Sequence, residues 1–455
     1  MMGVRVELWK KLQSIDLIFV LTYGIIYVNR ISEAIMKNYV YPADIYLPEL
    51  SGENGTRWAT VACDQYTSER EYWEAAERIV GDAPSTLRLM LPEAYLDREE
   101  TEIPKINATM REYLENGVLR CYENAMIYLE RVQSDGRVRR GLVCAIDLED
   151  YDFSKGSTTI TRATEGTVLE RIPPRVAIRR GALLELPHIM ILIDDPDGTV
   201  IEPLTAKAEM LSVAYDFELM ANSGSVKGYF LDDEEGGKIN GALGALCAEG
   251  AMKEKYGVDA PALLFAIGDG NHSLASAKSL YEEIKAEIGE EEARVHPARF
   301  ALCEIVNLHD SALEFEPIYR VVFGVDTDEF KKELYTYVSG LCGGADEQKI
   351  VLVCGDKEEE IVVKAPVSQL TVGTVQAFLD RYVKEHEGVS VDYIHGIEST
   401  RALASGDGAV GILFDGMGKN ELFKTVICDG ALPRKTFSMG HAADKRFYIE
   451  CRKIR

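Results

Sequence analysis

Short apolar runs alternate along the chain with segments in which apolar residues recur every three or four positions. The run Ala262–Ile267 ends at a glycine-containing turn, as a buried strand does. Beyond the turn, apolar residues recur at i, i+4, i+7 and i+11, on one face of a helix: Ala277, Tyr281, Ile284 and Ile288. The sequence therefore predicts a strand, a turn and a helix in succession.

Hairpin signals occur elsewhere in the chain. Met126–Arg131 and Gly141–Asp147 are apolar segments on either side of the turn sequence Ser134-Asp135-Gly136, and an acidic turn separates Lys349–Cys354 from Glu360–Val363. Strands and helices alternate irregularly, without the repeat of a doubly wound parallel sheet. We therefore predict an α+β fold of mixed sheets with hairpins and packed helices.

The same patterns give four further local predictions. Ser68 is followed three residues later by Glu71, which is the spacing of a capping box at a helix start. Turn residues and charge mark loops, and apolar runs mark strands. We expect a buried strand over Arg57–Cys63, a helix over 69–80 capped by Ser68, a hairpin between Ile189–Ile193 and Thr199–Ile201, and a loop over Asp232–Gly237.

The length of 455 residues suggests two or three domains, at roughly 150 residues each. We expect an N-terminal α/β domain over 37–230. A central region over 231–345 is expected to carry the strand-turn-helix unit. A C-terminal α/β region over 346–455 is expected to pack on the rest. Residues 1–35 are expected to be an N-terminal extension.

The extension contains an apolar run, Leu17–Val28, which at about 12 residues is too short to cross a bilayer comfortably. It has the length of the apolar part of a signal peptide, and Ser32-Glu33-Ala34 resembles a cleavage site. An acidic residue at its edge and an odd cysteine count argue against that interpretation. We expect that translation starts at Met36, because recognisable domain sequence begins only after it. An intact native mass that includes residues 1–35 would contradict this expectation.

Acidic residues outnumber basic ones, 75 to 50, which gives a net charge of −25. A surface of this charge repels phosphate backbones and anionic membranes, so nonspecific nucleic-acid binding and membrane adhesion are not expected. Small-molecule ligands and a homo-oligomer are compatible with the sequence. The nine cysteines include no C-x-x-C pair and lie mostly in apolar runs. We therefore expect buried thiols in the reducing cytoplasm rather than a zinc or redox motif.

The turn Gly268-Asp269-Gly270-Asn271-His272-Ser273 is the segment best suited to chemistry. Glycine lets the backbone approach a ligand closely. The first N–H groups of the following helix, with the positive end of its dipole, form an anion site. His272 and Ser273 add side-chain donors, and Asp269 can hold a metal ion or accept a proton. The alternative is that Asp269 or Asn271 only caps the helix, a role worth about 1 kcal/mol.

Three other segments carry candidate side chains. Asp64 lies where a strand leads into a helix, at the edge of the sheet, where ligands bind in α/β proteins. Arg162 and Thr164 belong to a segment of hydroxyls and one arginine that suits a phosphate or carboxylate, although a hydrated loop has the same composition. Lys435 lies in a basic loop that can close over an anion. A basic tail that balances the acidity of the chain is the alternative.

Four arginines lie within ten residues that contain no acid, and we expect at least two on the solvated face of a helix: Arg171, Arg175, Arg179 and Arg180. Five histidines have no metal-ligand spacing, and each is expected to be a surface or core residue: His188, His296, His309, His386 and His395. Motifs for a P-loop, a nucleophile elbow and a HExxH zinc site are missing from the sequence.

The chain resembles the DUF1015 family of uncharacterised prokaryotic proteins, from about Tyr41 to Ile454. Five segments carry the resemblance: Trp58–Ser68, Gly81–Tyr95, Gly268–Lys278, Leu313–Phe323 and Leu432–Thr436. Many relatives have a D-G-H-H-R-like turn where this chain has Ser273 in place of the arginine, and His-Arg where it has Tyr319-Arg320. The turn is similar to that of ParB/sulfiredoxin-like domains, in which a turn and a helix N-terminus hold nucleotide phosphates. Some members of that wider group are kinases of free serine.

The resemblance implies a nucleotide-dependent enzyme that acts on a small molecule, with phosphoryl transfer as the expected reaction and ATP or ADP with Mg²⁺ as cofactors. Asp269 or Asp64 is expected to hold Mg²⁺ or accept a proton, and His272 to neutralise developing charge. The nucleotide is expected to contact the turn and residues around it: Gly268, Gly270, Asn271, Ser273, Arg162, Thr164, Arg320 and Lys435.

Two alternatives stay open at this point. The first is a nucleotide-sensing or regulatory module that binds without catalysis. The second is a structural or partner-binding protein. Convergence of five side chains on one cleft would favour a ligand site: Asp64, Arg162, Asp269, His272 and Arg320.

Overall fold

Twelve strands form the larger of the two main sheets in the computed structural model, which describes residues 37–455. Predictions for residues 1–35 lie outside the described residues. The strand order is β5-β6-β11-β8-β12-β4-β3-β1-β20-β7, and β10 joins β3 to β9. The strands are β1 (Ala43–Leu47), β3 (Arg120–Val132), β4 (Val138–Asp147), β5 (Tyr151–Asp152), β6 (Thr161–Ala163), β7 (Leu184–Glu185), β8 (Met190–Ile193), β9 (Ser212–Glu218), β10 (Ser225–Leu231), β11 (Phe265–Asp269), β12 (Phe300–Asn307) and β20 (Cys451–Lys453).

The larger sheet is mixed. β11 runs parallel to β6 and antiparallel to β8, while β12 runs parallel to β8 and antiparallel to β4. The predicted hairpin is confirmed: β3 pairs with β4 in a register that sets Ile127 opposite Val143. A short ladder, β2 (Thr60–Val61) with β19 (Phe447–Tyr448), brings the end of the chain beside its beginning.

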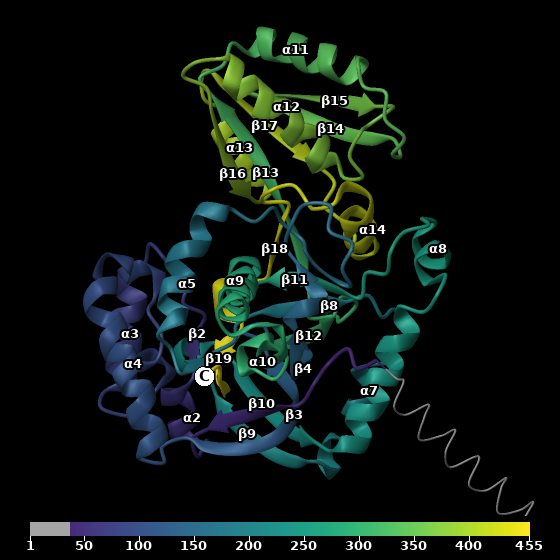
Figure 1. The fold of residues 1–455 in the computed structure, drawn as a ribbon. Helices are drawn as coiled ribbons and strands as arrows, with labels where there is room; N and C mark the ends of the chain where they lie inside the picture. Colours follow the sequence, from purple (N-terminus) through teal and green to yellow (C-terminus); the bar gives the residue numbers. More distant parts are fainter. Residues whose placement is uncertain (1–36) are drawn as a thin grey trace, which may run out of the picture. The chain divides into compact units, whose positions relative to one another are not determined.

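A smaller, antiparallel sheet of six strands has the order β15-β14-β17-β13-β16, with β18 paired to β13. Its strands are β13 (Phe315–Phe323), β14 (Gln348–Cys354), β15 (Lys357–Val363), β16 (Ser390–His395), β17 (Ala409–Phe414) and β18 (Phe437–Met439). Helices α11 (Thr327–Ser339), α12 (Thr371–Glu385) and α13 (Ile397–Ala404) pack on it (Figure 1). Phe330 of α11 meets Phe378 and Tyr382 of α12 edge to face. The predicted β14–β15 hairpin is confirmed.

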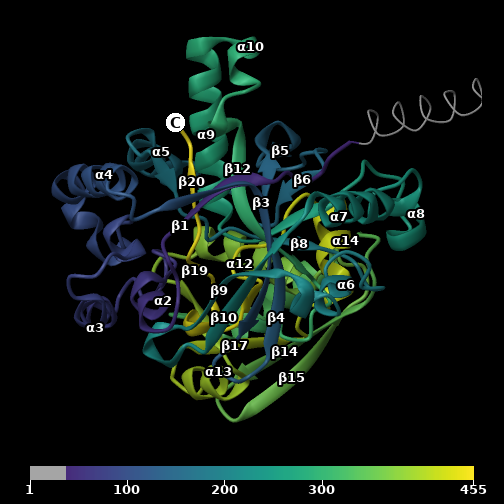
Figure 2. The ribbon, with the colours of Figure 1, turned by 90° about the horizontal axis from the view of Figure 1, so that it is seen from below.

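Helix α14 (Lys419–Asp429) connects β17 to β18 of the smaller sheet. The remaining helices belong with the larger sheet and its connections: α2 (Glu53–Trp58), α3 (Arg70–Val80), α4 (Glu99–Glu115), α5 (Ile172–Arg180), α6 (Glu202–Thr205), α7 (Asp233–Leu246), α8 (Ala251–Tyr256), α9 (Asn271–Ile288) and α10 (Glu290–Ala293). Figures 1 and 2 show α5 beside α9. Ile172 and Val176 of α5 are buried in one cluster with Leu280 and Ile284 of α9. This packing fixes α5 next to the helix that starts at the glycine turn. Among the described residues, no helix has the length and apolarity to cross a membrane.

Both sheets contribute to one apolar core. Leu192 and Ala266 of the larger sheet belong to the same buried cluster as Val322 and Ile412 of the smaller one. The larger sheet takes strands from both sides of residue 230, and the smaller sheet from both sides of residue 345. Residues Val40–Arg455 cluster as one compact unit. The division into 37–230, 231–345 and 346–455 therefore stays a prediction about folding units and does not follow the sheets.

Two local predictions near the N-terminus of the described chain are confirmed only in part. The buried strand expected over Arg57–Cys63 is limited to β2 (Thr60–Val61), because residues 57–58 end helix α2, where Gly55 packs directly against the ring of Phe217 and the Trp58 indole N–H donates to the Ile449 carbonyl. The helix expected over 69–80 is α3, but Ser68 does not cap it: the N-cap residue is Glu69, and its side chain makes no capping hydrogen bond.

Two short polar segments, predicted to form a hairpin turn and a loop, instead lead into helices. The residues after β8 form no hairpin, because the Asp195 carboxylate accepts the N–H groups of Thr199 and Val200 and starts a turn into α6. Asp232–Gly237 is the start of α7, which Asp232 caps by accepting the Glu235 N–H at 2.9 Å. The α+β prediction itself is confirmed by the mixed sheets and packed helices.

Candidate functional site

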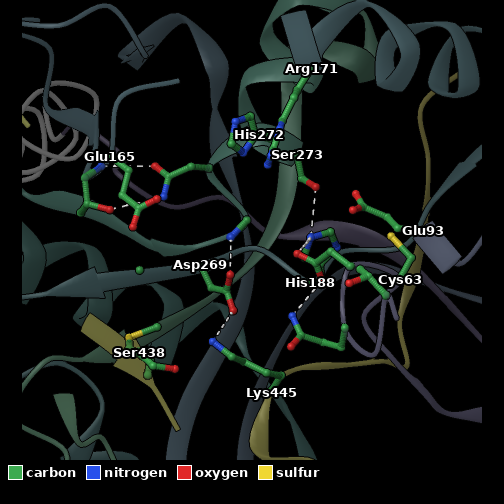
Figure 3. A pocket seen from close by; sticks show the side chains of 18 of the residues that line it. Cys63, Glu93, Glu165, Arg171, His188, Asp269, His272, Ser273, Ser438 and Lys445 are labelled. Carbon is green, nitrogen blue, oxygen red and sulfur yellow. Dashed lines mark hydrogen bonds and ion pairs between the residues drawn. The ribbon is translucent and has the colours of Figure 1, made fainter. Parts of the chain in front are cut away.

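A polar pocket of about 600 Å³ lies where the end of β11 and the start of α9 meet loops from distant parts of the chain (Figure 3). The predicted turn lines it from Gly268 to Ser273. The other lining residues come from the loop after β2, the short helix Glu93–Arg98, α5 and the segment before it, the entry to β8, the edge of the smaller sheet and the chain before β19. They are Cys63, Asp64, Gln65, Thr67, Glu93, Leu96, Thr164, Glu165, Arg171, Arg175, His188, Ile318, His395, Lys435, Phe437, Ser438, Met439 and Lys445.

The two glycines of the turn are required by packing against β8. A Cβ on Gly268 would lie 2.8 Å from Leu192 Cγ, and one on Gly270 would lie 3.1 Å from Ile189 Cα. Gly270 also has a φ of +79°, which side chains disfavour. Packing against the sheet therefore explains why glycine occupies both positions. The close approach of a ligand, which the sequence suggested, is not needed for that explanation.

Helix α9 starts without a side-chain cap. Its N-cap is Gly270, and the Asn271 side chain, an expected cap, instead bonds the Thr164 N–H at 3.2 Å and the Thr164 hydroxyl at 3.3 Å. Thr164 in turn donates from Oγ1 to the Ile267 carbonyl. These bonds hold the helix start against β6. The N–H groups of the first turn, which have no partner within a helix, belong to residues that line the pocket.

Asp269 forms an ion pair with Lys445, with Oδ2 3.1 Å from Nζ. Its other oxygen accepts the Gly270 N–H at 2.9 Å. Burial alone raises the pKa of Asp269, but the charges of Lys445 and His188 and these hydrogen bonds leave that pKa below its ordinary value. Asp269 is therefore a carboxylate with both oxygens engaged. Asp269 is therefore better suited to position Lys445 than to accept a proton.

Ser273 contacts a histidine that sequence reasoning assigned no role. Its Oγ lies 3.1 Å from Nε2 of His188, whose Nδ1 lies 2.8 Å from the Tyr448 hydroxyl. Tyr448 also bonds Cys63, accepting its N–H at 3.3 Å and donating to its sulfur at 3.2 Å. His188 Nε2 lies 3.8 Å from Asp64 Oδ2. The chain of contacts from Cys63 to Ser273 fixes the imidazole at the edge of the pocket.

His272 is uncharged under neutral conditions. Burial and the charges of Arg175 and Arg171 lower the pKa of His272 below its ordinary value of 6.5. Its Nε2 accepts the Val168 N–H at 3.3 Å, so the proton of the neutral ring lies on Nδ1. The expected role of His272 as a positive charge is therefore not supported near pH 7. The ring serves as a neutral hydrogen-bond donor.

Four basic side chains line the pocket, and they surround the helix start: Arg171, Arg175, Lys435 and Lys445. Arg175 forms an ion pair with Glu93 and donates to the Arg171 carbonyl at 3.0 Å. Figure 3 shows Arg171 and His272 on one side of the pocket and Ser438 and Lys445 on the other. Arg179 and Arg180 point elsewhere and pair with Glu185 and Glu283. Arg171 and Arg175 thus line the pocket, whereas Arg179 and Arg180 lie outside it.

Glu165 is the pocket carboxyl with the strongest tendency to hold a proton. Burial and the nearby charge of Asp269 raise the pKa of Glu165 above its ordinary value, while Lys435 and Lys445 oppose the shift. Its backbone pairs with Leu432, which ties β6 to the segment before β18. Glu165 therefore offers a carboxyl suited to acid or base chemistry on the side of the pocket near Lys435.

Arg162 and Arg320 lie outside the pocket, contrary to the expected convergence. Arg162 donates to the carbonyls of Thr159, Pro261 and Ala262, and so fixes the segment before β11. Arg320 is fully buried, bonds Gln376 and the Arg434 carbonyl, and lies over the Tyr393 ring. Both guanidiniums are bound by the protein itself. A role in neutralising ligand charge is therefore not supported for either.

The pocket carboxylates are spread out rather than gathered around one point. Among residues 37–455, one group of three ligand side chains has its atoms within 4.8 Å of one another, namely Glu329, Glu333 and His386 on α11 and next to α12. That group lies outside the pocket. Within the pocket, Asp64 is half-exposed and keeps Oδ2 at 3.8 Å from His188, so it is the carboxylate best placed to share an ion with a ligand.

Sequence reasoning found the turn, Asp64, Thr164 and Lys435, all of which line the pocket. It missed His188, Glu165 and Lys445. His188 lies alone before β8 with no motif around it, so pairing of β8 with β11 is needed to bring it to Ser273. Lys445 belongs to the basic C-terminal segment, in which Arg446 and Arg452 are buried against Glu304 and Glu185.

No curated protein matches the chain. Among solved structures, a conserved hypothetical protein from Pyrococcus furiosus is 10% identical over 66% of this chain and 90% of that one, with a TM-score of 0.32. A free serine kinase in complex with AMP is 13% identical over 69% of this chain and 91% of the kinase, with a TM-score of 0.36. SbnI with a C-terminal truncation, from Staphylococcus aureus, is 11% identical over 66% and 82%, with a TM-score of 0.31. TM-scores this low carry no functional argument.

A family match covers most of the chain. Residues 49–382 match the family described as protein of unknown function, DUF1015. The matched range includes the glycine turn, His188, Asp64 and the arginines of α5, and it ends before Lys435 and Lys445. The resemblance seen in the sequence is confirmed at this level: the chain belongs to the DUF1015 family.

Proposed function

We propose that this protein binds a nucleotide and transfers a phosphoryl group from it to a small molecule. The observation that carries the proposal is the uncapped start of α9, which faces a pocket with four basic side chains. Free N–H groups at a helix start bind phosphate oxygens, and lysine and arginine beside them neutralise their charge. The same lining holds four acids, Asp64, Glu93, Glu165 and Asp269, so in a chain of net charge −25 the pocket is balanced in charge rather than acidic.

The transfer is a displacement at phosphorus. A hydroxyl oxygen of the small molecule bonds the terminal phosphorus, the bond from that phosphorus to the nucleotide breaks, and the nucleotide leaves with the electron pair. The hydroxyl proton passes to a base, for which His188 Nε2 and Glu165 are the candidates in the pocket. Arg171, Lys435 and Lys445 are placed to stabilise the charge on the transferred group.

Mg²⁺ fits this site as an ion shared between protein and nucleotide. Mg²⁺ usually binds one or two carboxylates and completes its shell with waters and phosphates. Asp64 offers such a carboxylate, whereas Asp269, the ligand expected from the sequence, has both oxygens engaged. When bound, Mg²⁺ would supply positive charge to the phosphate oxygens. Asp64 is the residue we assign to it.

A nucleotide-sensing module without turnover is the second candidate. One observation favours it: Asp269 and the Glu93 carboxylate are both held in ion pairs, with Lys445 and Arg175, so two of the four pocket acids are not free bases. Binding would then depend on the same basic side chains, without transfer of a phosphoryl group.

Further parts of the proposal rest on the sequence and on single features. We propose that β11, the turn and α9 form a ParB/sulfiredoxin-like element. All nine cysteines are unpaired thiols, which supports a reducing, cytoplasmic location. The ligand is a small molecule rather than a nucleic acid, because the chain is strongly acidic outside the pocket.

The test begins with a thermal-shift panel of the full chain with ATP, ADP and AMP, each with and without Mg²⁺. We expect at least one nucleotide to raise the melting temperature; a flat panel would contradict both candidate functions. Arg171→Gln is expected to abolish the shift. Arg180→Gln, which breaks only a surface pair with Glu283, is the matched control and is expected to keep it. Release of ADP from ATP in the presence of a pool of small hydroxyl compounds separates the enzyme from the sensor.

A further inference from the structure

A second, apolar cavity adjoins the polar pocket. Its volume is about 190 Å³, and it shares six lining residues with the polar pocket: Cys63, Glu93, Leu96, Arg175, His188 and Ser273. Beyond these it is lined mostly by apolar side chains from α4, α5 and the strands nearby, including Leu89, Met90, Met110, Ile178, Ala182 and Leu184. The two cavities therefore adjoin along these side chains, among them the Ser273–His188 contact.

The apolar cavity has the size of a definite chemical group. An engineered apolar cavity of about 150 Å³ stays dry and binds benzene. A cavity of 190 Å³ therefore accepts one aromatic ring or one branched aliphatic group. Met90 and Met110 lie in its wall, and methionine adapts its shape to such a group.

The polar pocket on its own has few apolar side chains in its lining, namely Leu96, Ile318, Phe437 and Met439. Small-molecule sites usually combine apolar walls with a few convergent polar groups. Here the polar groups at the junction are the Ser273 hydroxyl, the His188 imidazole and the Arg175–Glu93 ion pair. A ligand that extends from the junction into the apolar cavity would meet both kinds of surface.

We propose that the small-molecule substrate is amphiphilic: its polar group binds at Ser273 and His188, and its single aromatic ring or branched aliphatic group fills the cavity beside Met90 and Met110. This inference rests on the proposed function in taking the polar pocket as the nucleotide side of the site. It deepens that function by naming the substrate class, and it excludes small, fully polar acceptors such as glycerol.

The experiment observes the methionine methyl groups of the full chain by NMR, after labelling with [¹³C-methyl]methionine. The Met90 and Met110 signals are assigned with Met90→Leu and Met110→Leu. Benzyl alcohol, 3-methylbutan-1-ol and glycerol are titrated separately. We expect the first two alcohols to shift both signals saturably, and glycerol to leave them in place at the same concentrations. Unchanged Met90 and Met110 signals with all three would overturn the inference.

Cavity-filling variants locate the bound group. Ala182→Phe and Ile178→Phe place a ring in the cavity and are expected to weaken benzyl alcohol binding at least tenfold while nucleotide thermal shifts stay unchanged. Undiminished binding to either folded variant would contradict the inference. If neither variant folds, the titration of the unsubstituted chain still decides. Nucleotide shifts are measured in parallel, so alcohol binding without nucleotide binding refutes the proposed function alone, and nucleotide binding without alcohol binding refutes only this inference.

Discussion

Lys445 holds Asp269 at 3.1 Å, and this ion pair joins the last residues of the chain to the turn before α9. Replacing Lys445 by Met leaves a largely buried carboxylate without its partner. We expect a loss of about 2 kcal/mol in the free energy of unfolding, together with at least tenfold weaker nucleotide binding. Urea unfolding and calorimetric titration measure the two effects.

Lys349→Met is the matched control for this substitution. Lys349 pairs with Glu360 at 3.3 Å, but both side chains are more than half exposed. Exposed pairs contribute about 0.2–1 kcal/mol. An effect of Lys349→Met on stability equal to that of Lys445→Met would mean that the pocket pair is no more than an ordinary surface contact.

The ion pair also predicts how acid affects stability. Because the pKa of Asp269 in the folded protein lies below its ordinary value, its stabilising effect is present above the ordinary pKa of about 3.9 and is lost as the pH falls through the folded value. Asp269→Asn removes this effect. We expect the stability difference between the native chain and Asp269→Asn to be largest near neutral pH and to shrink below about pH 4. A difference that grew in acid would have the wrong sign.

Gly270 should tolerate no side chain. Its φ of +79° opposes alanine, and so does Ile189, whose Cα would lie 3.1 Å from the added Cβ. Gly257 has a similar φ of +72° with open space around it, so Gly257→Ala measures the backbone strain alone. That strain is about 1–2 kcal/mol. We expect Gly270→Ala to lower the unfolding free energy by more than Gly257→Ala and, alone of the two, to weaken nucleotide binding. Equal losses would show that packing against β8 is unimportant.

His272 predicts a pH dependence of anion binding. Its pKa lies below 6.5, mainly through burial, so the ring is neutral at pH 7 and gains charge only in more acidic solution. Nucleotide affinity should therefore rise as the pH falls below about 6.5, the ordinary pKa of histidine, and His272→Gln should remove this dependence. Protein stability should change in the opposite direction, because protonation of a buried ring favours the unfolded chain, in which its pKa is higher. Titration calorimetry between pH 5 and pH 8 measures the affinity.

The Ser273–His188 contact predicts coupled effects of substitution. If His188 acts on Ser273 and on the substrate held there, Ser273→Ala and His188→Gln should each reduce turnover, and the double variant should be no worse than the poorer single one. Contacting residues in one network couple by about 0.5–3 kcal/mol. Nucleotide binding should change little in either variant, so the loss should fall on the rate rather than on nucleotide affinity. Strict additivity would show that the two side chains act independently.

The strand-turn-helix unit was predictable because it is local. An apolar run, two glycines and the periodic positions from Ala277 to Ile288 lie within one continuous stretch of sequence. The long-range part of the site was not predictable in this way. His188 reaches Ser273 only because β8 pairs with β11, and Lys445 reaches Asp269 only because the chain end returns beside β2. Neither residue carries a local pattern that marks it.

Two arginines that the sequence predicted in the site do not line the pocket. Arg162 and Arg320 have the residue type that binds phosphate, yet both lie in the interior with carbonyls or an amide as partners. Arg171 is of the same residue type and does line the pocket. Residue type indicates what a side chain can bind, whereas tertiary packing decides whether a ligand or the protein's own backbone becomes the partner.

Binding of nucleotide phosphates by the start of α9 and the basic side chains around it is the proposal on which the others depend. Its decisive test is calorimetric titration of the full chain with ADP in Mg²⁺, repeated for Lys445→Met, Arg171→Gln and Arg180→Gln. We expect saturable binding by the native chain and by Arg180→Gln, with affinity reduced at least tenfold in the other two variants. ADP binding with the same affinity in all four proteins would place the nucleotide elsewhere and refute the proposed site.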